Sequence, residues 1–134
     1  MVVARTELLP IRSESDVVFV RQQVRAWCVE LQFSLVDQTK MVTAASELAR
    51  NTLVHGKGGT VEVQIVEDAE RRGLRMLFED QGPGIPDVDL ALKDGYTTGT
   101  GMGLGLGGSR RLVHDFSIHS QPGAGTRVSV LRWK

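Results

Sequence analysis

Several features are scarce in this chain, and each scarcity excludes a class of protein. Cys28 is the single cysteine among 134 residues, which excludes an intramolecular disulfide and a zinc site built from several thiolates. No stretch approaches the roughly 18 consecutive apolar residues that a membrane span needs. Lys+Arg and Asp+Glu number 16 each, so the formal net charge is zero and gives no electrostatic footprint for nucleic acid.

Length and the amino-terminal sequence narrow the class further. A chain of 134 residues predicts one domain, residues 1–134, with one hydrophobic core. The first residues lack the charged-then-apolar pattern of a signal peptide. We therefore expect a cytoplasmic protein that binds neither a membrane nor nucleic acid. Glycine, by contrast, is abundant: there are 15, and six of them lie between Gly99 and Gly108.

Hydrophobic periodicity predicts five strands and three helices. Apolar residues three and four apart indicate helices with one buried stripe, and strict alternation indicates strands with one buried face. The region 81–101 has no periodicity, and so long a loop in a small domain is usually functional or mobile. The predicted strands cover 6–11, 60–66, 74–80, 116–120 and 126–133, and the predicted helices run from Ser13 or Ser15 to Leu31, from 36 to 54 and from 102 to 114.

This order of elements predicts an α+β two-layer sandwich. Strands that alternate apolar and polar residues are typical of an antiparallel sheet with one face buried and one in water. We expect a mostly antiparallel five-stranded sheet, covered on one face by the three helices.

The second predicted helix carries three polar residues at intervals of four. Glu47, Asn51 and His55 lie on one helical face, next to the apolar stripe. The neutral oxygen of Asn suits Mg²⁺ when phosphates supply the remaining negative charge. A solvated polar face is the competing interpretation, and this feature alone does not exclude it.

The end of a predicted strand carries the second feature, Asp80, followed by Gly82 and Gly84. A carboxylate only accepts hydrogen bonds, so at the floor of a pocket it selects an amino group and rejects a carbonyl. Adenine fits this rule and guanine does not. The glycines let backbone approach a flat ring closely. A tight Asp-x-Gly turn remains the alternative.

The third feature is the glycine-rich segment 99–108. Each glycine in a helix costs about 1 kcal/mol relative to alanine, so bare backbone at these positions needs a reason. Exposed N–H groups at the start of a helix make a phosphate site. A flexible linker is the alternative, but leucines at alternate positions are unusual in linkers. No Gly-Lys-Ser or Gly-Lys-Thr occurs, which excludes a P-loop.

Together these segments resemble the GHKL (Bergerat-fold) ATP-binding superfamily. Residues 47–51 are similar to its N box, 80–85 to its G1 box and 99–106 to its G2 box, while Gly125-Thr126 resembles the late Gly-Thr that helps to hold adenine. The segments 46–51, 79–87 and 94–98 are most similar to the RsbT-type serine/threonine switch kinases of bacterial stress signalling.

The resemblance implies a role for each matching residue. ATP and Mg²⁺ are the implied cofactors, with Asn51 as the metal ligand and His55 near the phosphates. Asp80 accepts from the adenine amine with help from Thr126, and Gly82 and Gly84 make room for the base. Glu47 is the implied general base for an incoming hydroxyl. The residues that line the triphosphate are Gly101, Gly103 and Gly105.

The resemblance also implies partners. The expected substrate is a STAS-domain antagonist protein phosphorylated on Ser or Thr, and kinases of this group also activate a PP2C-type phosphatase. Two other functions stay open at this point. One is an anti-sigma factor or other non-catalytic module that uses ATP to set its shape, and the other is a detached ATPase domain that serves a histidine protein in trans.

Overall fold

The computed structural model describes residues 1–93 and 105–134. No helix in these two ranges combines the length and the apolar character that crossing a membrane requires. The elements follow in the order β1 (Val2–Ile11), α1 (Glu14–Glu30), α2 (Leu35–Val54), β2 (Gly59–Asp68), β3 (Arg71–Asp80), α3 (Val88–Ala91), α4 (Gly105–Arg110), β4 (Asp115–Gln121) and β5 (Gly125–Trp133).

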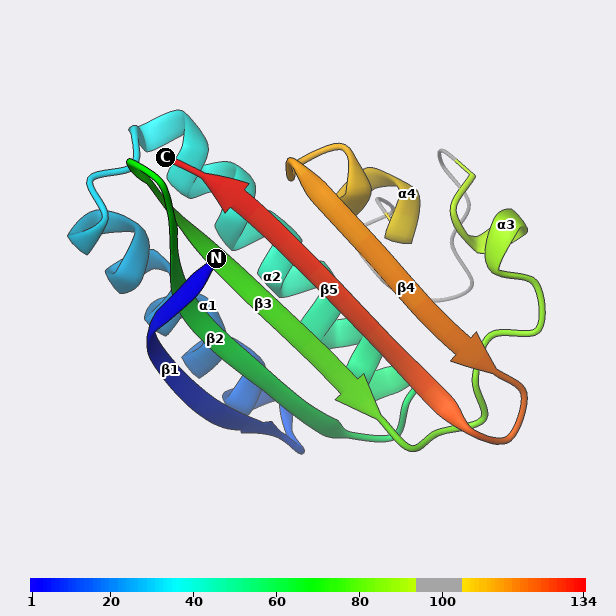
Figure 1. The fold of residues 1–134 in the computed structure, drawn as a ribbon. Helices are drawn as coiled ribbons and strands as arrows, with labels where there is room; N and C mark the ends of the chain where they lie inside the picture. Colours follow the sequence, from blue (N-terminus) through cyan, green and yellow to red (C-terminus); the bar gives the residue numbers. More distant parts are fainter. Residues whose placement is uncertain (94–104) are drawn as a thin grey trace.

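The strands form one antiparallel sheet in the order β1-β2-β3-β5-β4. Figure 1 shows α1 and α2 lying against one face of this sheet. α4 packs against α2, and α3 contacts α4. The predicted α+β architecture is confirmed. The short helix α3 is an addition, because it lies inside the region that was predicted to be an aperiodic loop.

Local sequence signals explain where the two long helices begin. The side chain of Ser13 accepts a hydrogen bond from the Asp16 N–H, and that of Ser34 accepts one from the Asp37 N–H. Both are N-caps, which satisfy backbone donors that have no partner within the helix. The choice between Ser13 and Ser15 is therefore settled in favour of Ser13.

The core lies between the helices and the covered face of the sheet. Alternate residues of β2 and β3 point inward, for example Val63 and Met76, which are almost completely buried. They pack in one cluster with the apolar stripe of α2, including Met41 and Leu48. Each such side chain contributes about 1.5–3 kcal/mol when fully buried. This packing fixes where α2 ends relative to the ends of the strands.

Two strand boundaries differ from prediction because strand pairing extends them. β1 begins at Val2 rather than residue 6, since it pairs with β2 along its whole length. The charged link predicted at 67–73 is mostly strand, and the turn is reduced to Ala69 and Glu70. Ion pairs of 3.4 Å between Glu67 and Arg72 and of 3.1 Å between Asp68 and Arg71 join the hairpin at this end.

The third long helix was predicted to reach residue 114, and this is wrong. α4 ends at Arg110, and the chain turns through residues 111–114 to enter β4. The His114 N–H already donates to the carbonyl of Leu131 on β5 at 2.9 Å, so pairing with the sheet replaces the helix there. The predicted helix start at residue 102 lies outside the described residues.

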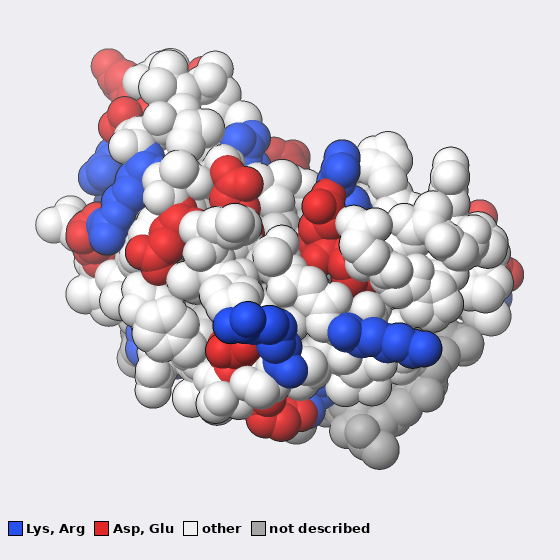
Figure 2. Space-filling model, turned by 90° about the horizontal axis from the view of Figure 1, so that it is seen from below, with Lys and Arg blue, Asp and Glu red and all other residues white. Residues whose placement is uncertain are grey.

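Charges are dispersed over the surface. Figure 2 shows Lys and Arg interspersed with Asp and Glu on the face seen from below Figure 1, without a large area of one sign. Both tryptophans lie against an arginine. The guanidinium carbon of Arg5 is 4.2 Å from the ring centroid of Trp27, and that of Arg71 is 4.1 Å from the ring centroid of Trp133.

Arg132 joins three parts of the fold from a half-buried position on β5. Its guanidinium donates to Asp37 at 2.7 Å and to the carbonyl of Leu112 at 3.1 Å. Burial raises the pKa of Asp37, but the hydrogen bond and positive charge of Arg132 outweigh burial and hold this pKa below its ordinary value. The first turn of α2 is thereby held against β5 and the segment that follows α4.

This depressed pKa has a measurable consequence. A carboxylate of this kind stabilises the fold above its unfolded pKa of about 3.9, and the contribution is lost as pH falls through the folded pKa. We expect Asp37→Asn to lower the free energy of unfolding by about 2 kcal/mol at pH 7 and by less at pH 3, measured by urea denaturation. Asp68→Asn, which removes an exposed ion pair, is the control and should cost under about 0.5 kcal/mol. Equal losses for Asp37→Asn at the two pH values would contradict the assignment.

Candidate functional site

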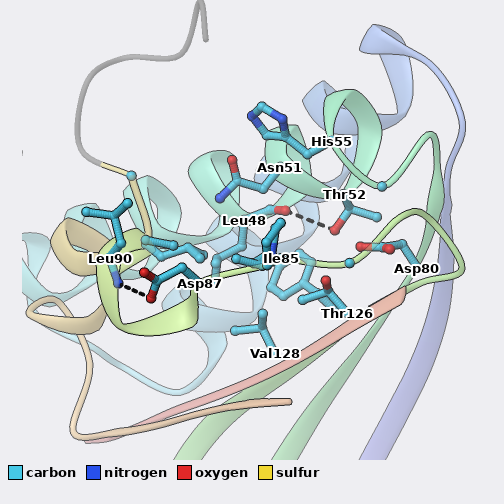
Figure 3. Close-up of a pocket in the computed structure, with 17 residues that line it drawn as sticks. Leu48, Asn51, Thr52, His55, Asp80, Ile85, Asp87, Leu90, Thr126 and Val128 are labelled. Carbon is cyan, nitrogen blue, oxygen red and sulfur yellow. Dashed lines mark hydrogen bonds between the residues drawn. The ribbon is translucent and has the colours of Figure 1, made fainter. Parts of the chain in front are cut away.

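A pocket of about 340 Å³ lies where the end of α2 meets the sheet, α3 and α4. Figure 3 shows polar side chains around an apolar cavity: Asp80 and Thr126 lie on one side, Asp87 lies on the other beside Leu90, and Asn51 lies above. Apolar side chains, including Leu48, line the space between them. This size and lining are typical of a small-molecule site.

Strand register brings polar side chains together at one end of the sheet. Asp80 on β3 pairs with Thr126 on β5, which in turn pairs with Ser120 on β4. One row further in, the paired residues Phe78 and Val128 are apolar and buried. The core face of the sheet therefore changes from apolar to polar where the pocket begins.

The carboxylate of Asp80 is held in place by close packing. Asp80 is only 9% exposed, and its Oδ1 accepts a hydrogen bond from the Gly82 N–H at 2.9 Å. A Cβ at Gly56 would fall on this carboxyl group, so the end of α2 can approach Asp80 only without a side chain. Gly56 follows the end of α2 without a positive φ, which occurs at Lys57 and Gly58 instead.

Gly82 and Gly84 were predicted to make room for a flat ring. Gly84 lines the pocket, whereas Gly82 is not among the described lining residues. The crowding at both positions comes from the protein itself. A Cβ at Gly82 would meet the backbone of Gly56, and one at Gly84, where φ is +78°, would meet the carbonyl of Gln121. The two glycines thus shape the pocket by letting chain segments pack closely.

The three polar residues on this face of α2 lie in different surroundings. Asn51 and His55 both line the pocket. Glu47, one turn earlier, is 5% exposed and is not among the described lining residues. Burial raises the pKa of Glu47, and the positive charge of Arg50 offsets part of this effect. Arg50 itself donates to Glu14 at 3.2 Å, which joins α2 to the start of α1.

Only the end of the glycine-rich segment can be placed. Gly105, the first described residue of α4, lines the pocket and has a φ of +62°. Gly101 and Gly103 lie outside the described residues. The neighbouring Leu106 is buried and also lines the pocket, so it anchors this part of the segment to the core.

The sequence did not predict the wall of the pocket that α3 and the residue before it form. α3 contributes Leu90 and Ala91, and Asp87 lines the pocket just before it. The Oδ1 of Asp87 accepts from the Leu90 N–H at 3.0 Å, so Asp87 is the N-cap of α3. An Asp directly before an apolar residue, with a second acidic residue in the first turn, is a helix-start signal, and it could have located α3.

The described residues contain no cluster of three or more His, Cys, Asp and Glu side chains that could hold a metal ion. Asn51 can offer one neutral oxygen at the pocket. A divalent cation could therefore be held here only if a bound anionic ligand supplied most of its charge and ligands. This donor set fits Mg²⁺ bound together with phosphates.

The geometry suits a flat ligand that carries an amine. A buried acceptor lies at one end, apolar side chains form the walls, and an amide and an imidazole line the other side. Rejection of a carbonyl follows from the same acceptor, because a carbonyl oxygen opposite Asp80 would leave both groups unpaired.

Comparisons with known proteins agree with this geometry. Residues 36–134 match the family described as histidine kinase-, DNA gyrase B-, and HSP90-like ATPase. The chain is 42% identical to the serine/threonine-protein kinase RsbT of Bacillus subtilis over 92% of both chains, and 29% identical to an anti-sigma F factor of Clostridium kluyveri over 82% of this chain and 80% of that one.

Solved structures show the same fold. The RsbU and RsbW domains of a protein from Mycobacterium tuberculosis match with a TM-score of 0.67 and 21% identity, over 96% of this chain and 32% of that longer chain. The mycobacterial sensor histidine kinase MprB matches with a TM-score of 0.55 and 18% identity, over 96% of this chain and 97% of that chain.

The raised pKa of Glu47 predicts that ionising this residue opposes folding. Stability that depends on the protonated form is present below the unfolded pKa and is lost as pH rises through the folded pKa. Glu47→Gln does not titrate, so we expect its free energy of unfolding relative to the wild type to be higher at pH 8 than at pH 4. Urea denaturation at both pH values measures this difference. A Gln variant that loses relative stability as pH rises would contradict the prediction.

Proposed function

The chain belongs to the histidine kinase-, DNA gyrase B-, and HSP90-like ATPase family, and on this basis we propose that it is an ATP-dependent serine/threonine kinase of a bacterial partner-switching module. Its similarity to RsbT over nearly the whole of both chains supports kinase activity rather than ATP binding alone. The observation that carries the proposal is the buried carboxylate of Asp80, set beside Thr126 in a pocket of about 340 Å³.

Asp80 recognises the base in this proposal. Its carboxylate accepts from the exocyclic amine of adenine, and the apolar side chains around it, such as Phe78 and Val128, pack against the ring. Thr126 adds a hydroxyl at the neighbouring ladder position. Gly84 lines the pocket, where its lack of a side chain lets the segment after β3 pack against Gln121.

The phosphates lie towards Asn51 and His55 in this proposal, because Figure 3 shows these two pocket residues apart from Asp80. Gly105 of α4 also lines the pocket. Asn51 supplies an oxygen to Mg²⁺, which when bound neutralises charge on the triphosphate. Gly101 and Gly103, outside the described residues, are proposed to continue the same lining with backbone N–H groups.

The chemical step is transfer of the γ-phosphoryl group to a serine or threonine hydroxyl. The substrate oxygen forms the new bond to phosphorus, the bond between the γ-phosphorus and the β–γ bridging oxygen breaks, and ADP leaves. Glu47 accepts the hydroxyl proton. A carboxyl whose pKa is raised by burial suits this role, since a proton acceptor works best when its pKa approaches the working pH.

A STAS-domain protein is the proposed substrate, and a PP2C-type phosphatase is the proposed second partner. The similarity to an anti-sigma F factor supports a second candidate, in which the chain captures a sigma factor. Phosphorylation of a STAS protein without any sigma factor present would favour the switch kinase.

The proposed base is tested by Glu47→Gln. We expect phosphoryl transfer from labelled ATP with Mg²⁺ to a STAS-domain protein of the same organism to fall at least about 100-fold. The Kd for ATP, measured by calorimetry, should stay within about threefold of the wild-type value, because Glu47 does not line the described pocket. Unchanged transfer in this variant would remove Glu47 from the mechanism.

The base-recognition role is tested by Asp80→Asn. Loss of a charged acceptor should weaken ATP binding about 10- to 100-fold and reduce the preference for ATP over GTP. The matched control is Glu79→Gln on the same strand, whose carboxylate pairs with Arg127 at 2.7 Å on the opposite face of the sheet. Its ATP affinity should equal that of the wild type. An adenine preference that survives Asp80→Asn would refute the proposed site.

A further inference from the structure

Ser120 makes three hydrogen-bond contacts directly behind the pocket. Its Oγ accepts from the Ile85 N–H at 2.7 Å, lies 3.2 Å from the carbonyl oxygen of Gly125 and lies 2.8 Å from the Oγ1 of Thr126. We propose that Ser120 is a positioning residue that presents the Thr126 hydroxyl as a hydrogen-bond donor to a purine ring nitrogen. The inference rests on the proposed adenine site.

Its place in the fold suits a residue that acts through a neighbour. Ser120, Thr126 and Asp80 occupy one row across β4, β5 and β3, on the core face of the sheet. Thr126 and Asp80 line the pocket, whereas Ser120 is not among the described lining residues. Ile85, which lines the pocket, belongs to the segment that follows β3. Ser120 therefore joins this segment to Thr126 from behind.

The direction in which the Ser120 hydroxyl donates its proton determines whether Thr126 can donate to a ligand. A hydroxyl carries one proton and accepts through its lone pairs, and the Ile85 N–H already takes one acceptor position on Ser120. If the Ser120 proton goes to the carbonyl of Gly125, Thr126 must donate to Ser120 and faces the pocket only as an acceptor. If the Ser120 proton goes to Thr126, the Thr126 hydroxyl can donate its own proton to a ligand.

Adenine requires the second arrangement. The two ring nitrogens that flank the exocyclic amine, N1 and N7, are both acceptors. Asp80 only accepts, so it takes the amine, and Thr126 as its ladder neighbour meets one of the flanking nitrogens. Donation to that nitrogen requires Ser120 to donate to Thr126, across the shorter of the two contacts available to its proton.

Nucleotide analogues test this inference by binding alone. We would measure by calorimetry, in the full chain, the Kd for ATP, for 1-deaza-ATP, for 7-deaza-ATP and for purine riboside triphosphate, which lacks the amine. The wild type should bind one of the deaza analogues about tenfold more weakly than ATP, the loss of one net hydrogen bond, and that analogue identifies the nitrogen. The amine-less nucleotide should be bound weakly because Asp80 loses its donor.

Ser120→Ala removes the group that orients the Thr126 hydroxyl, so it should weaken the discrimination between ATP and the sensitive deaza analogue and keep the discrimination against the amine-less nucleotide. The ratio of Kd values between the sensitive deaza analogue and ATP should fall below about threefold, while purine riboside triphosphate stays as disfavoured as in the wild type. Ser117→Ala on the exposed side of β4 is the matched control and should leave every ratio unchanged. A merely structural role for Ser120 would weaken all four nucleotides by one common factor, and that result would overturn the inference.

Thr126→Val provides a second test that does not depend on the folding of Ser120→Ala. It should remove the same discrimination, and adding Ser120→Ala to it should change the ratio no further. A Thr126→Val protein that still distinguishes the deaza analogue refutes the inference. A wild type that binds ATP but distinguishes neither analogue refutes the inference alone, whereas a wild type that binds no ATP refutes the proposed function with it.

Discussion

The chemistry of the pocket depends on one buried carboxylate that has few hydrogen-bond partners within the protein. Asp80 is 9% exposed and accepts one hydrogen bond, from Gly82, among the described residues. A carboxylate removed from water needs several donors, so its remaining capacity is directed at whatever enters the pocket. The close approach of Gly56 leaves no room for a side chain beside the carboxyl group. The proposed specificity for an amine therefore depends on the hydrogen bonds that Asp80 can still accept.

The fold supplies the rest of the site through the antiparallel sheet and the helices on one of its faces. Inner rows of the covered face, such as Phe78 with Val128, pack into the core and fix the strands. The end row carries Asp80, Thr126 and Ser120. Because the neighbouring apolar rows are packed in the core, they also hold these polar side chains in position. α2 brings Asn51 to the same place from the helical layer. The proposed recognition of the base therefore rests on the sheet, while the proposed phosphate contacts come from helices and the segment before α4.

The sequence predicts what depends on local spacing and misses what depends on distant pairing. Asp80 and Asn51 could be placed because each belongs to a periodic element whose buried face can be read directly. Ser120 and Gly56 could not, since their roles arise only when β4 meets β5 and when α2 ends against β3. The shared helical face of Glu47 and Asn51 was predictable, but the burial that separates Glu47 from the described pocket depends on packing in three dimensions.

The stacking of each tryptophan on an arginine has a practical consequence. Trp27 packs in the core and Trp133 ends β5, at the opposite end of that strand from Thr126, so neither indole lines the described pocket. Intrinsic indole emission will therefore follow unfolding of the helical layer and of the sheet, and will respond little to a nucleotide. Fluorescence studies of ligand uptake need a labelled nucleotide or an indole introduced close to Ile85.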